Sequence, residues 1–529
     1  KAMVRTVAGL KPVSLLWNRL PSAMFDPLEL DSSSMLGAAG LVEAIRTGAL
    51  RTVNMVGAGV LETRALMAFF PKIARAYLGR GLALPNIATW WCGQDSQRDH
   101  VIANSARMMV GDAFSTVPLM ADPNTRAFGD LGDGPYAQEL AELLKNEGHR
   151  LVGQEAVTLS TTPVWENGKL VPRPMCIRIS MGRTENGWAV MPGGYARISA
   201  GDDAKALAMQ RGGKVADVWV TSPKRVETPT LLSASKNAVT RSLTHALLPS
   251  RAADNLFWLG RYVERSEQNM RMFRAYFARI SDGADHGDSM PTFIRDHLMG
   301  GVEPSASAIA VRFGEPLGLA LQSASRISDR FSPDGMMALR GLVTDARALE
   351  AQHVPLEDTP ARISGLLRQI TGFAGLVHEN MYRSDGWRFL SIGTSLERAA
   401  NMCDLLAACL SAEASSGALD LALEIGDSVV SHRTRFQIAA SAGSVTDLLA
   451  LDPNNPRAVR YHITRTRDHI ANLPTQHEDH HMSHVARQVL LLETQLATSE
   501  PEIISPEVLG QIKQDIWSIS DTLNAYHLA

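Results

Sequence analysis

Three short segments decide the fold of the first half of this chain: GQEAVTLS at 153–160, PRPMCIRI at 172–179 and MPGGYAR at 191–197, followed by QRGG at 210–213 and DVWV at 217–220. Apolar residues typical of strands alternate there with turns that carry Gln, Glu, Arg and paired Gly. Arg offers a planar fork of donors for phosphate oxygens, and Gly lets backbone N–H groups approach a ligand closely. The pattern predicts a β-sheet whose turns bind a polyanionic ligand.

The composition is that of an ordinary globular protein. The chain has 529 residues, of which 45% are hydrophobic and 20% charged, and this length predicts two to four domains. The formal net charge of −3 gives no electrostatic reason to expect a nucleic-acid partner. No apolar run reaches the roughly 18 residues of a membrane helix, so no membrane partner is expected either.

The four cysteines form no CxxC pair. We interpret them as free thiols in a reducing compartment, which predicts a cytoplasmic protein. No signal peptide is visible. The chain begins with Lys1 in sequence that resembles the middle of a domain, so we expect that the natural N-terminus lies further upstream.

A strand, a glycine turn and a helix follow one another near residue 55. Residues 51–56 resemble a strand, Gly57-Ala58-Gly59 supplies the turn, and apolar residues recur at near-helical spacing from 60 to 78. Free N–H groups at such a helix start can bind an anion, whereas a plain strand-to-helix connection is the simpler explanation. Neither GxGxxG nor Gly-Lys-Ser accompanies the turn.

The character of the chain changes after Pro249. Before it, Asn167-Gly168 and Asn186-Gly187 predict two β-hairpins. Residues 222–248 are polar with two prolines, and we interpret them as a linker. From 249 to 529 amphipathic helices dominate, and segments 254–280 and 387–410 each carry a continuous apolar stripe. We therefore predict an α+β region at 1–221 and an all-α helical bundle at 249–529.

The two striped helices resemble each other. Residues 257–265 (FWLGRYVER) align with 390–398 (LSIGTSLER), which indicates a pseudo-repeat of about 130 residues with a Gly-x-x-φ-Glu-Arg core, φ being apolar. Glycine in a helix costs about 1 kcal/mol relative to alanine, so Gly260 and Gly393 are expected at close helix crossings. The Glu-Arg pairs are either buried ion pairs between helices or the lining of a charged groove.

One histidine cluster matches a metal-site pattern. His477-Glu478-Asp479-His480-His481 fits H-E-x-x-H, and His484 lies one turn further on. On a helix His477 and His481 would share a face suited to zinc. Acidic and polar residues after a Leu-Pro-Thr sequence are also typical of a helix start. The cluster is therefore either a zinc site or an ordinary helix start, and the sequence assigns no metal ligand.

Several ordered matches identify a family resemblance. Residues 26–30, 36–41, 54–62 and 88–93, with the motifs quoted above, resemble the later part of a circularly permuted ATP-grasp domain of type 2. Residues 250–261, 387–390, 396–399 and 452–457 resemble the helical Alpha-E domain. The resemblance covers nearly the whole chain. It implies an ATP-grasp-like region at 1–221 and an Alpha-E domain at 249–529.

The resemblance implies an ATP-dependent carboxylate–amine ligase. Such enzymes transfer the γ-phosphoryl group of ATP to a carboxylate, and an amine attacks the acyl phosphate to form a peptide-like amide bond. Positioned cations suit the charge that develops on the phosphate oxygens. The implied cofactors are ATP and Mg²⁺, and the implied partners are carboxylate and amine substrates, including peptides. Apolar helical faces favour a homo-oligomer, with the helical domain binding a substrate or partner.

The resemblance also implies roles for individual residues. Gln154 and Glu155 would bind adenine and ribose, and the arginines would contact phosphate or acyl phosphate. The candidates for catalysis are Arg173, Arg178 and Arg197, and those for cofactor binding are Asn54, Gln154, Glu155, Gly193, Gly194, Gln210, Gly212, Gly213 and Asp217. For the arginines the alternative is a surface or ion-pair role, for the glycines ordinary turns, and for Gln154-Glu155 an edge-strand pair.

Three departures from the family pattern bear on activity. The acidic metal motif with a Glu-Asn pair would precede Lys1. The second Gly pair continues as Gly213-Lys214 in place of a Ser-Lys-Asp sequence, so Lys214 is a candidate substitute. Thr394 stands in the second helical repeat where Arg261 stands in the first. The competing hypothesis is a catalytically degenerate protein that binds nucleotide or acts as a scaffold, and a metalloenzyme built on the histidines is a third.

Overall fold

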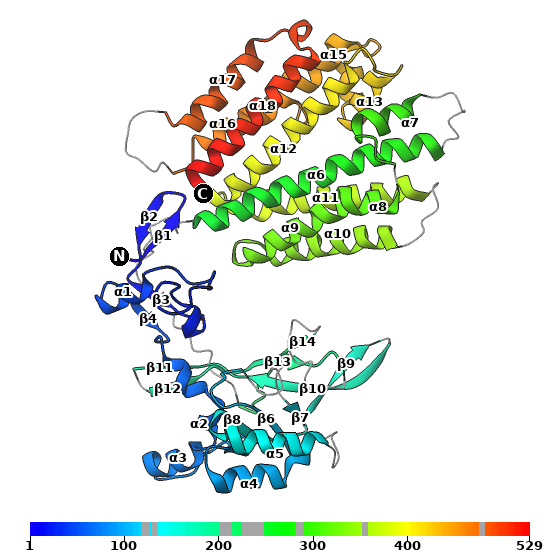
Figure 1. The fold of residues 1–529 in the computed structure, drawn as a ribbon. Helices are drawn as coiled ribbons and strands as arrows, with labels where there is room; N and C mark the ends of the chain where they lie inside the picture. Colours follow the sequence, from blue (N-terminus) through cyan, green and yellow to red (C-terminus); the bar gives the residue numbers. More distant parts are fainter. Residues whose placement is uncertain are drawn as a thin grey trace. The chain divides into compact units, whose positions relative to one another are not determined.

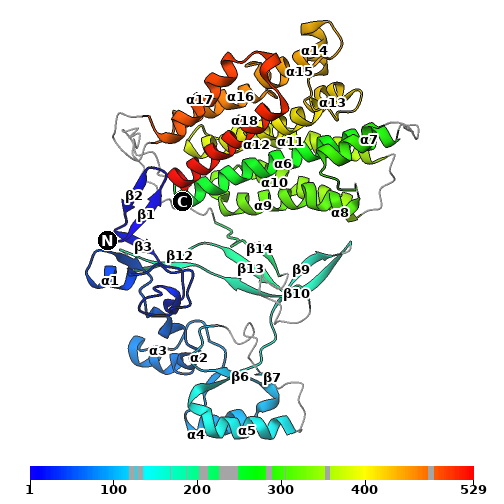
Figure 2. The same ribbon diagram turned by 45° about the horizontal axis from the view of Figure 1, so that its top comes forward.

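The computed structural model describes residues 1–117, 126–127, 135–166, 168–185, 187–201, 213–224, 248–281, 289–303, 305–351, 358–474 and 482–528. The chain divides into two compact units. The first comprises residues 1–2 and 13–239, and the second comprises residues 3–12 and 240–529. Figure 1 and Figure 2 show strands and short helices in the first unit and long helices in the second. The prediction of an α+β region followed by a helical domain is confirmed.

The start of the first unit consists of short elements. Strands β3 (Leu15–Trp17) and β4 (Arg51–Val53) pair in parallel, and α1 (Leu41–Arg46) lies between them in sequence. The prediction of one helix over 60–78 is wrong. The segment consists of the 3₁₀-helix η2 (Ala58–Glu62), α2 (Arg64–Met67) and α3 (Phe70–Leu78). Thr63 is extended, with a ψ of 140°, and Pro71 favours the start of a new helix.

A four-stranded antiparallel sheet of order β5-β8-β6-β7 follows, with strands Thr89–Trp91, Leu151–Glu155, Met108–Asp112 and Arg126–Ala127. Helices α4 (Asp95–Ala103) and α5 (Pro135–Glu147) belong to this part, with the 3₁₀-helices η3 (Ser105–Arg107) and η5 (Gly148–Arg150). Its small core is formed by apolar residues of the sheet and both α-helices, namely Cys92, Val101, Met108, Val110 and Leu144.

The second sheet is also antiparallel, in the order β14-β13-β10-β9. Its strands are β9 (Thr161–Glu166), β10 (Lys169–Arg178), β13 (Gly194–Ile198) and β14 (Lys214–Val218). A separate hairpin consists of β11 (Met181–Thr184) and β12 (Gly187–Val190). Both predicted hairpins are confirmed, since Glu166 pairs with Lys169 and Thr184 pairs with Gly187.

The second unit is helical. Its long helices are α6 (Ser250–Ser281), α9 (Glu315–Arg326), α10 (Pro333–Ala351), α11 (Thr359–Asn380), α12 (Asp385–Cys409), α16 (Val459–Ile470), α17 (His484–Thr498) and α18 (Pro506–Leu523). The shorter α-helices are α7 (Met290–Phe293), α8 (Ala306–Ile309), α13 (Ala418–Ile425), α14 (Val429–Phe436) and α15 (Ala442–Thr446). No described helix is both long and apolar enough to cross a membrane.

Two similar helical groups meet at the centre of this unit. Helix α6 packs on α9 and α11, and α12 packs on α16 and α18 in the same order along the chain. Helices α6 and α12 lie side by side in both views (Figure 1 and Figure 2). In each group a π-helix precedes the second long helix: η9 (Ala310–Gly314) in the first and η12 (Asp447–Leu451) in the second. The pseudo-repeat seen in the sequence thus corresponds to a repeated arrangement of helices.

The crossing of α6 and α12 depends on two glycines. A Cβ on Gly260 would lie 2.3 Å from the carbonyl oxygen of Leu390, and one on Gly393 would lie 2.1 Å from that of Phe257. Phe257 and Leu390 occupy equivalent positions in the repeat, so the contact is reciprocal. Only glycine permits this approach, because both obstructing atoms belong to the backbone of the facing helix.

The N-terminal hairpin completes the helical unit. Strands β1 (Met3–Thr6) and β2 (Gly9–Pro12) flank Val7, which is 1% exposed and belongs to the helical core. The N–H of Val7 donates to Leu248 O at 3.0 Å, and its carbonyl oxygen lies 3.1 Å from Nδ1 of His527 in the π-helix η14 (Asn524–Leu528). This hairpin therefore joins the beginning and the end of the unit.

Candidate functional site

Two predicted phosphate-contacting arginines share one face of the sheet β14-β13-β10-β9. Paired residues of neighbouring strands point to the same face, and side chains alternate along a strand. Arg178 pairs with Tyr195, which pairs with Asp217, and Arg197 lies two residues beyond Tyr195. The Arg197 guanidinium carbon lies 6.0 Å from the Tyr195 ring centroid. A hydrogen bond from Arg197 and the charge of Arg178 lower the pKa of the Tyr195 phenol, so both guanidinium groups act on the same point of this face.

The third predicted arginine lies on the opposite face. Arg173 is five positions from Arg178 in β10, an odd number. Its Nη2 donates to Glu166 Oε2 at 2.7 Å, and Lys214 Nζ donates to Glu166 Oε1 at 3.0 Å. Hydrogen bonds from Arg173 and Lys214 lower the pKa of Glu166 to about 2. The structure thus separates Arg173, whose charge is paired, from Arg178 and Arg197.

The first glycine pair lies where three strands meet. Gly193 has a φ of 96°, which favours glycine, and a Cβ there would lie 2.9 Å from Val218 O. A Cβ on Gly194 would lie 2.3 Å from Arg178 O. Close strand packing accounts for both glycines. Gly213 immediately precedes β14, whereas Gln210 and Gly212 lie outside the described residues.

The predicted adenine- and ribose-binding residues belong to the other sheet. Gln154 in β8 is 8% exposed, and its Nε2 donates to Thr89 Oγ1 at 3.0 Å. Glu155 ends the same strand and is exposed. Asn54 has a left-handed φ of 62°, and its Nδ2 donates to Asn18 O at 3.0 Å. Both amide side chains have intramolecular partners, and neither lies on the sheet that carries the arginines.

The predicted metal motif lies mostly outside the described residues, which exclude 475–481. His484 begins α17 directly after the N-cap Ser483. Within the described part of the chain, no group of three or more His, Cys, Asp and Glu side chains is arranged to hold a metal ion.

In the helical unit the two Glu-Arg motifs pair with each other across the crossing of α6 and α12. Arg398 donates through Nε and Nη2 to both carboxylate oxygens of Glu264 at 2.5 Å. Arg265 Nε donates to Glu397 Oε1 at 2.7 Å, and Arg261 Nε donates to Glu397 Oε2 at 2.8 Å. Both carboxylates are 3% exposed, so the motifs form buried ion pairs between helices.

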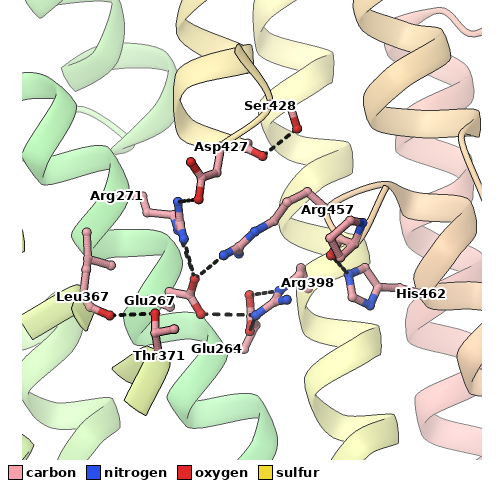
Figure 3. A network of polar contacts seen from close by, with 12 residues as sticks. Glu264, Glu267, Arg271, Leu367, Thr371, Arg398, Asp427, Ser428, Arg457 and His462 are labelled. Atoms are coloured by element: carbon pink, nitrogen blue, oxygen red, sulfur yellow. Dashed lines mark hydrogen bonds and ion pairs between the residues drawn. The ribbon is translucent and has the colours of Figure 1, made fainter. Parts of the chain in front are cut away.

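A second carboxylate extends the network around Glu264, through the shared Arg398. Glu267, one turn after Glu264, accepts hydrogen bonds from Arg271 at 2.9 Å, Arg457 at 2.7 Å and Arg398 at 3.2 Å. Figure 3 shows these three guanidinium groups converging on Glu267 from different parts of the chain. Burial alone would raise the pKa of Glu267, but the three cations outweigh it and lower the pKa to about 2.

A cavity of about 390 Å³ lies beside this network. One wall is apolar and includes Leu259, Val263, Ile370, Phe373, Val377, Trp387 and Leu390. The polar lining contains both signs of charge and several hydroxyls, namely Glu264, Glu267, Thr371, His378, Glu379, Ser391, Thr394, Ser395, Arg398 and Arg465. A concave, mostly apolar site with a few convergent polar groups is typical of small-molecule binding. Glu264 and Arg398, one residue from each Glu-Arg motif, therefore form an ion pair at the crossing and also line a charged cavity.

Family models match both parts of this chain. One model, described as a predicted alpha-helical domain with a conserved ER motif, matches residues 248–311 and 313–528. The chain belongs to the Alpha-E family. A second model, circularly permuted ATP-grasp type 2, matches residues 1–199, so the Alpha-E domain follows an ATP-grasp region in this chain. The pairs Glu264-Arg265 and Glu397-Arg398 are the Glu-Arg sequences at the centre of the Alpha-E domain.

Three relatives that match this chain are named as uncharacterized proteins. Rv2567 of Mycobacterium tuberculosis is 27% identical over 588 aligned positions, which cover 100% of this chain and 64% of that protein. Mb2434c of Mycobacterium bovis is 26% identical over 46% of this chain and 43% of its own length. The protein sll0335 of Synechocystis is 26% identical over 41% of this chain and 44% of its own length. The chain thus spans about 64% of the length of the first of these relatives.

Sequence reasoning missed part of the Alpha-E network. Glu267 and Arg271 are four residues apart in α6 and form an ion pair on one helix face, a spacing that could have been recognised. Arg457 belongs to the segment 452–457 that resembles the Alpha-E domain, but no spacing in the sequence relates it to Glu267, which lies 190 residues away. Only the three-dimensional arrangement brings it to the carboxylate.

The described residues suit the two implied cofactors unequally. Arg178 and Arg197 on one sheet face fit the oxygens of a polyphosphate, because guanidinium groups donate paired hydrogen bonds to phosphate. The described part of the chain offers no cluster of acidic side chains for Mg²⁺. ATP is therefore compatible with the arginine face, and no step is assigned to a metal ion.

Proposed function

We propose that this chain is part of an ATP-dependent carboxylate–amine ligase that forms a peptide-like amide bond. The observation that carries the proposal is the pair Arg178 and Arg197, on one sheet face of an ATP-grasp region, with Tyr195 between them. The ion pairs found in this sheet among the described residues use Arg173 and Lys214 instead. Arg178 and Arg197 both hydrogen-bond Tyr195 and form no ion pair with a described carboxylate, so their positive charge is suited to a polyphosphate chain.

In this proposal the arginine face binds and orients the phosphates of ATP. The carboxylate oxygen of the substrate attacks the γ-phosphorus and ADP leaves. The amine then attacks the acyl carbon, inorganic phosphate leaves, and the amine proton passes to solvent. Positioned cations stabilise the charge on the phosphoryl oxygens during transfer. Arg178 and Arg197 act at the first step, and the Alpha-E domain binds a substrate or partner.

The test measures ATP binding and ADP release by the full-length gene product with pooled amino acids and short peptides. Arg178→Ala and Arg197→Ala are compared with Arg183→Ala, which changes an exposed arginine in the β11–β12 hairpin. A hydrogen bond to a charged group contributes about 1.5–3 kcal/mol. We therefore expect each of the first two variants to weaken ATP binding roughly 10- to 100-fold, and the control to bind normally.

Two other results would redirect the proposal. ATP that binds through both arginines but is not turned over with any pool would favour the catalytically degenerate, nucleotide-binding scaffold. Equal ATP affinity in all three variants would refute the role of the arginine face. Circular dichroism of each variant establishes that the fold is retained.

A further inference from the structure

The Alpha-E cavity lies at one of two equivalent positions in the repeat. The other equivalent position lies on the far side of the crossing of α6 and α12. There the first repeat carries Trp258, Arg261 and Tyr262. There the Arg261 guanidinium carbon lies 4.9 Å from the ring centroid of Trp258 and 4.5 Å from that of Trp517, and it is buried. Large side chains therefore occupy that side of the crossing, which we call the filled half.

The second repeat has small residues at the same positions: Ser391, Thr394 and Ser395. All three line the cavity. The cavity therefore exists because three large side chains of one repeat are replaced by three small hydroxyl-bearing ones in the other. It corresponds to the place that the Arg261 guanidinium occupies in the filled half.

This correspondence indicates a place for a cation. In the filled half Arg261 donates to Glu397, which also binds Arg265. The equivalent carboxylate in the cavity is Glu264, which among the residues that the structure describes is hydrogen-bonded to Arg398 and to no second arginine. Each carboxylate oxygen accepts more than one hydrogen bond. Glu264 therefore retains acceptor capacity where its counterpart has a second cation, and Glu379 adds negative charge to the same lining.

The cavity also offers a place for an anion. Arg465 lines it and has no carboxylate partner among the residues that the structure describes; its guanidinium carbon lies 5.7 Å from the Tyr461 ring centroid. Arg398 uses Nε and Nη2 for Glu264 and Glu267, and its Nη1 has no hydrogen-bond partner among the described residues. Burial and the charges of Arg465 and Arg388 lower the pKa of the nearby His469 to about 4, as expected beside a cationic group.

From this arrangement we propose that the Alpha-E cavity binds a zwitterion with an apolar side chain, either a free α-amino acid or a short peptide. Its ammonium group pairs with Glu264, its carboxylate with Arg465 and Arg398 Nη1, and its side chain lies against the wall of α6 and α11. A volume of about 390 Å³ accommodates a ligand of this size. The inference concerns binding alone and does not rest on the ligase proposal.

The test is titration calorimetry of the full chain without ATP. The probes are leucine, leucyl-leucine, leucinamide without the carboxylate, and N-acetyl-leucine without the ammonium group. Arg465→Gln removes one charge without leaving a described carboxylate unpaired, and Ala374→Leu narrows the cavity from the exposed side of α11. Arg487→Gln, an exposed change in α17, is the matched control.

We expect leucine or leucyl-leucine to bind at least about tenfold more tightly than both blocked analogues. Arg465→Gln should remove the preference for leucine over leucinamide. Ala374→Leu should weaken the binding of every probe, and Arg487→Gln should bind each probe with the affinity of the unmodified chain. The stronger of leucine and leucyl-leucine identifies the source of the zwitterion. The proposal is refuted if both analogues bind as well as leucine, if Ala374→Leu leaves affinity unchanged, or if no probe binds at millimolar concentrations.

Discussion

Replacement of Gly393 by alanine tests the packing at the centre of the Alpha-E domain. The new Cβ would lie 2.1 Å from Phe257 O, whereas ordinary contacts begin near 3.4 Å. Because the obstructing atom is backbone, no rotamer change relieves the overlap, and α6 and α12 must separate by about 1 Å. Overpacking costs about 1–3 kcal/mol, and we place this case at the upper end. The helix propensity of alanine returns about 1 kcal/mol, which leaves a net destabilisation of about 2 kcal/mol.

The matched control is Gly372→Ala in α11, where an added Cβ meets no atom within 4 Å. This variant should gain about 1 kcal/mol from helix propensity alone. The two variants should therefore differ by about 3 kcal/mol, or roughly 6 °C or more in Tm for a domain of this size. The assay is thermal unfolding of the full chain followed by circular dichroism, using the transition of the helical unit. If Gly393→Ala melts at or above the temperature of Gly372→Ala, the close crossing is wrong.

Three further outcomes follow from burial and charge. Arg261→Lys should destabilise the helical unit by about 3 kcal/mol and Arg265→Lys by less than about 1 kcal/mol in denaturant titrations, because both bind Glu397 but their side chains are 6% and 39% exposed. Native protein should expose one reactive thiol, that of Cys176, to a thiol reagent at neutral pH, and four after denaturation, because the other three are buried. The pKa of Glu267 is lowered to about 2 from an ordinary 4.5, so its contribution to stability is complete above about pH 4.5 and is lost as pH falls toward 2; acid titration of Glu267→Gln should lack this loss.

The sequence predicted the features that depend on local periodicity. Asn167-Gly168 predicted a hairpin because a two-residue turn needs residues that tolerate positive φ, and Gly168 has a φ of 79°. The matching Gly and Glu-Arg sequences predicted a repeated helix crossing. The alternation of side chains along β10 could also have shown that Arg173 and Arg178 lie on opposite faces of the sheet, because the spacing between them is odd.

Long-range contacts were beyond the sequence. The breaks after η2 and before α3, by contrast, had local signals in the N-cap Thr63 and in Pro71, which the apolar spacing over 60–78 concealed. Arg457 reaches Glu267 only because the loop before α16 lies against α6. The cavity likewise depends on which helix covers each repeat, since α18 provides Trp517 on one side and α11 provides Ile370 and Phe373 on the other.

The difference between the repeats links stability to binding. If both repeats carried an arginine at the position of Arg261, each half would be filled and the crossing would be a purely structural core. Thr394 removes one of the two guanidinium groups but leaves its carboxylate counterpart, Glu264, in place. A buried carboxylate without enough partners is destabilising, and here Arg398 satisfies it while Arg271 and Arg457 neutralise the adjacent Glu267. The additional cations on this side therefore allow the domain to keep a polar cavity beside the close crossing of α6 and α12.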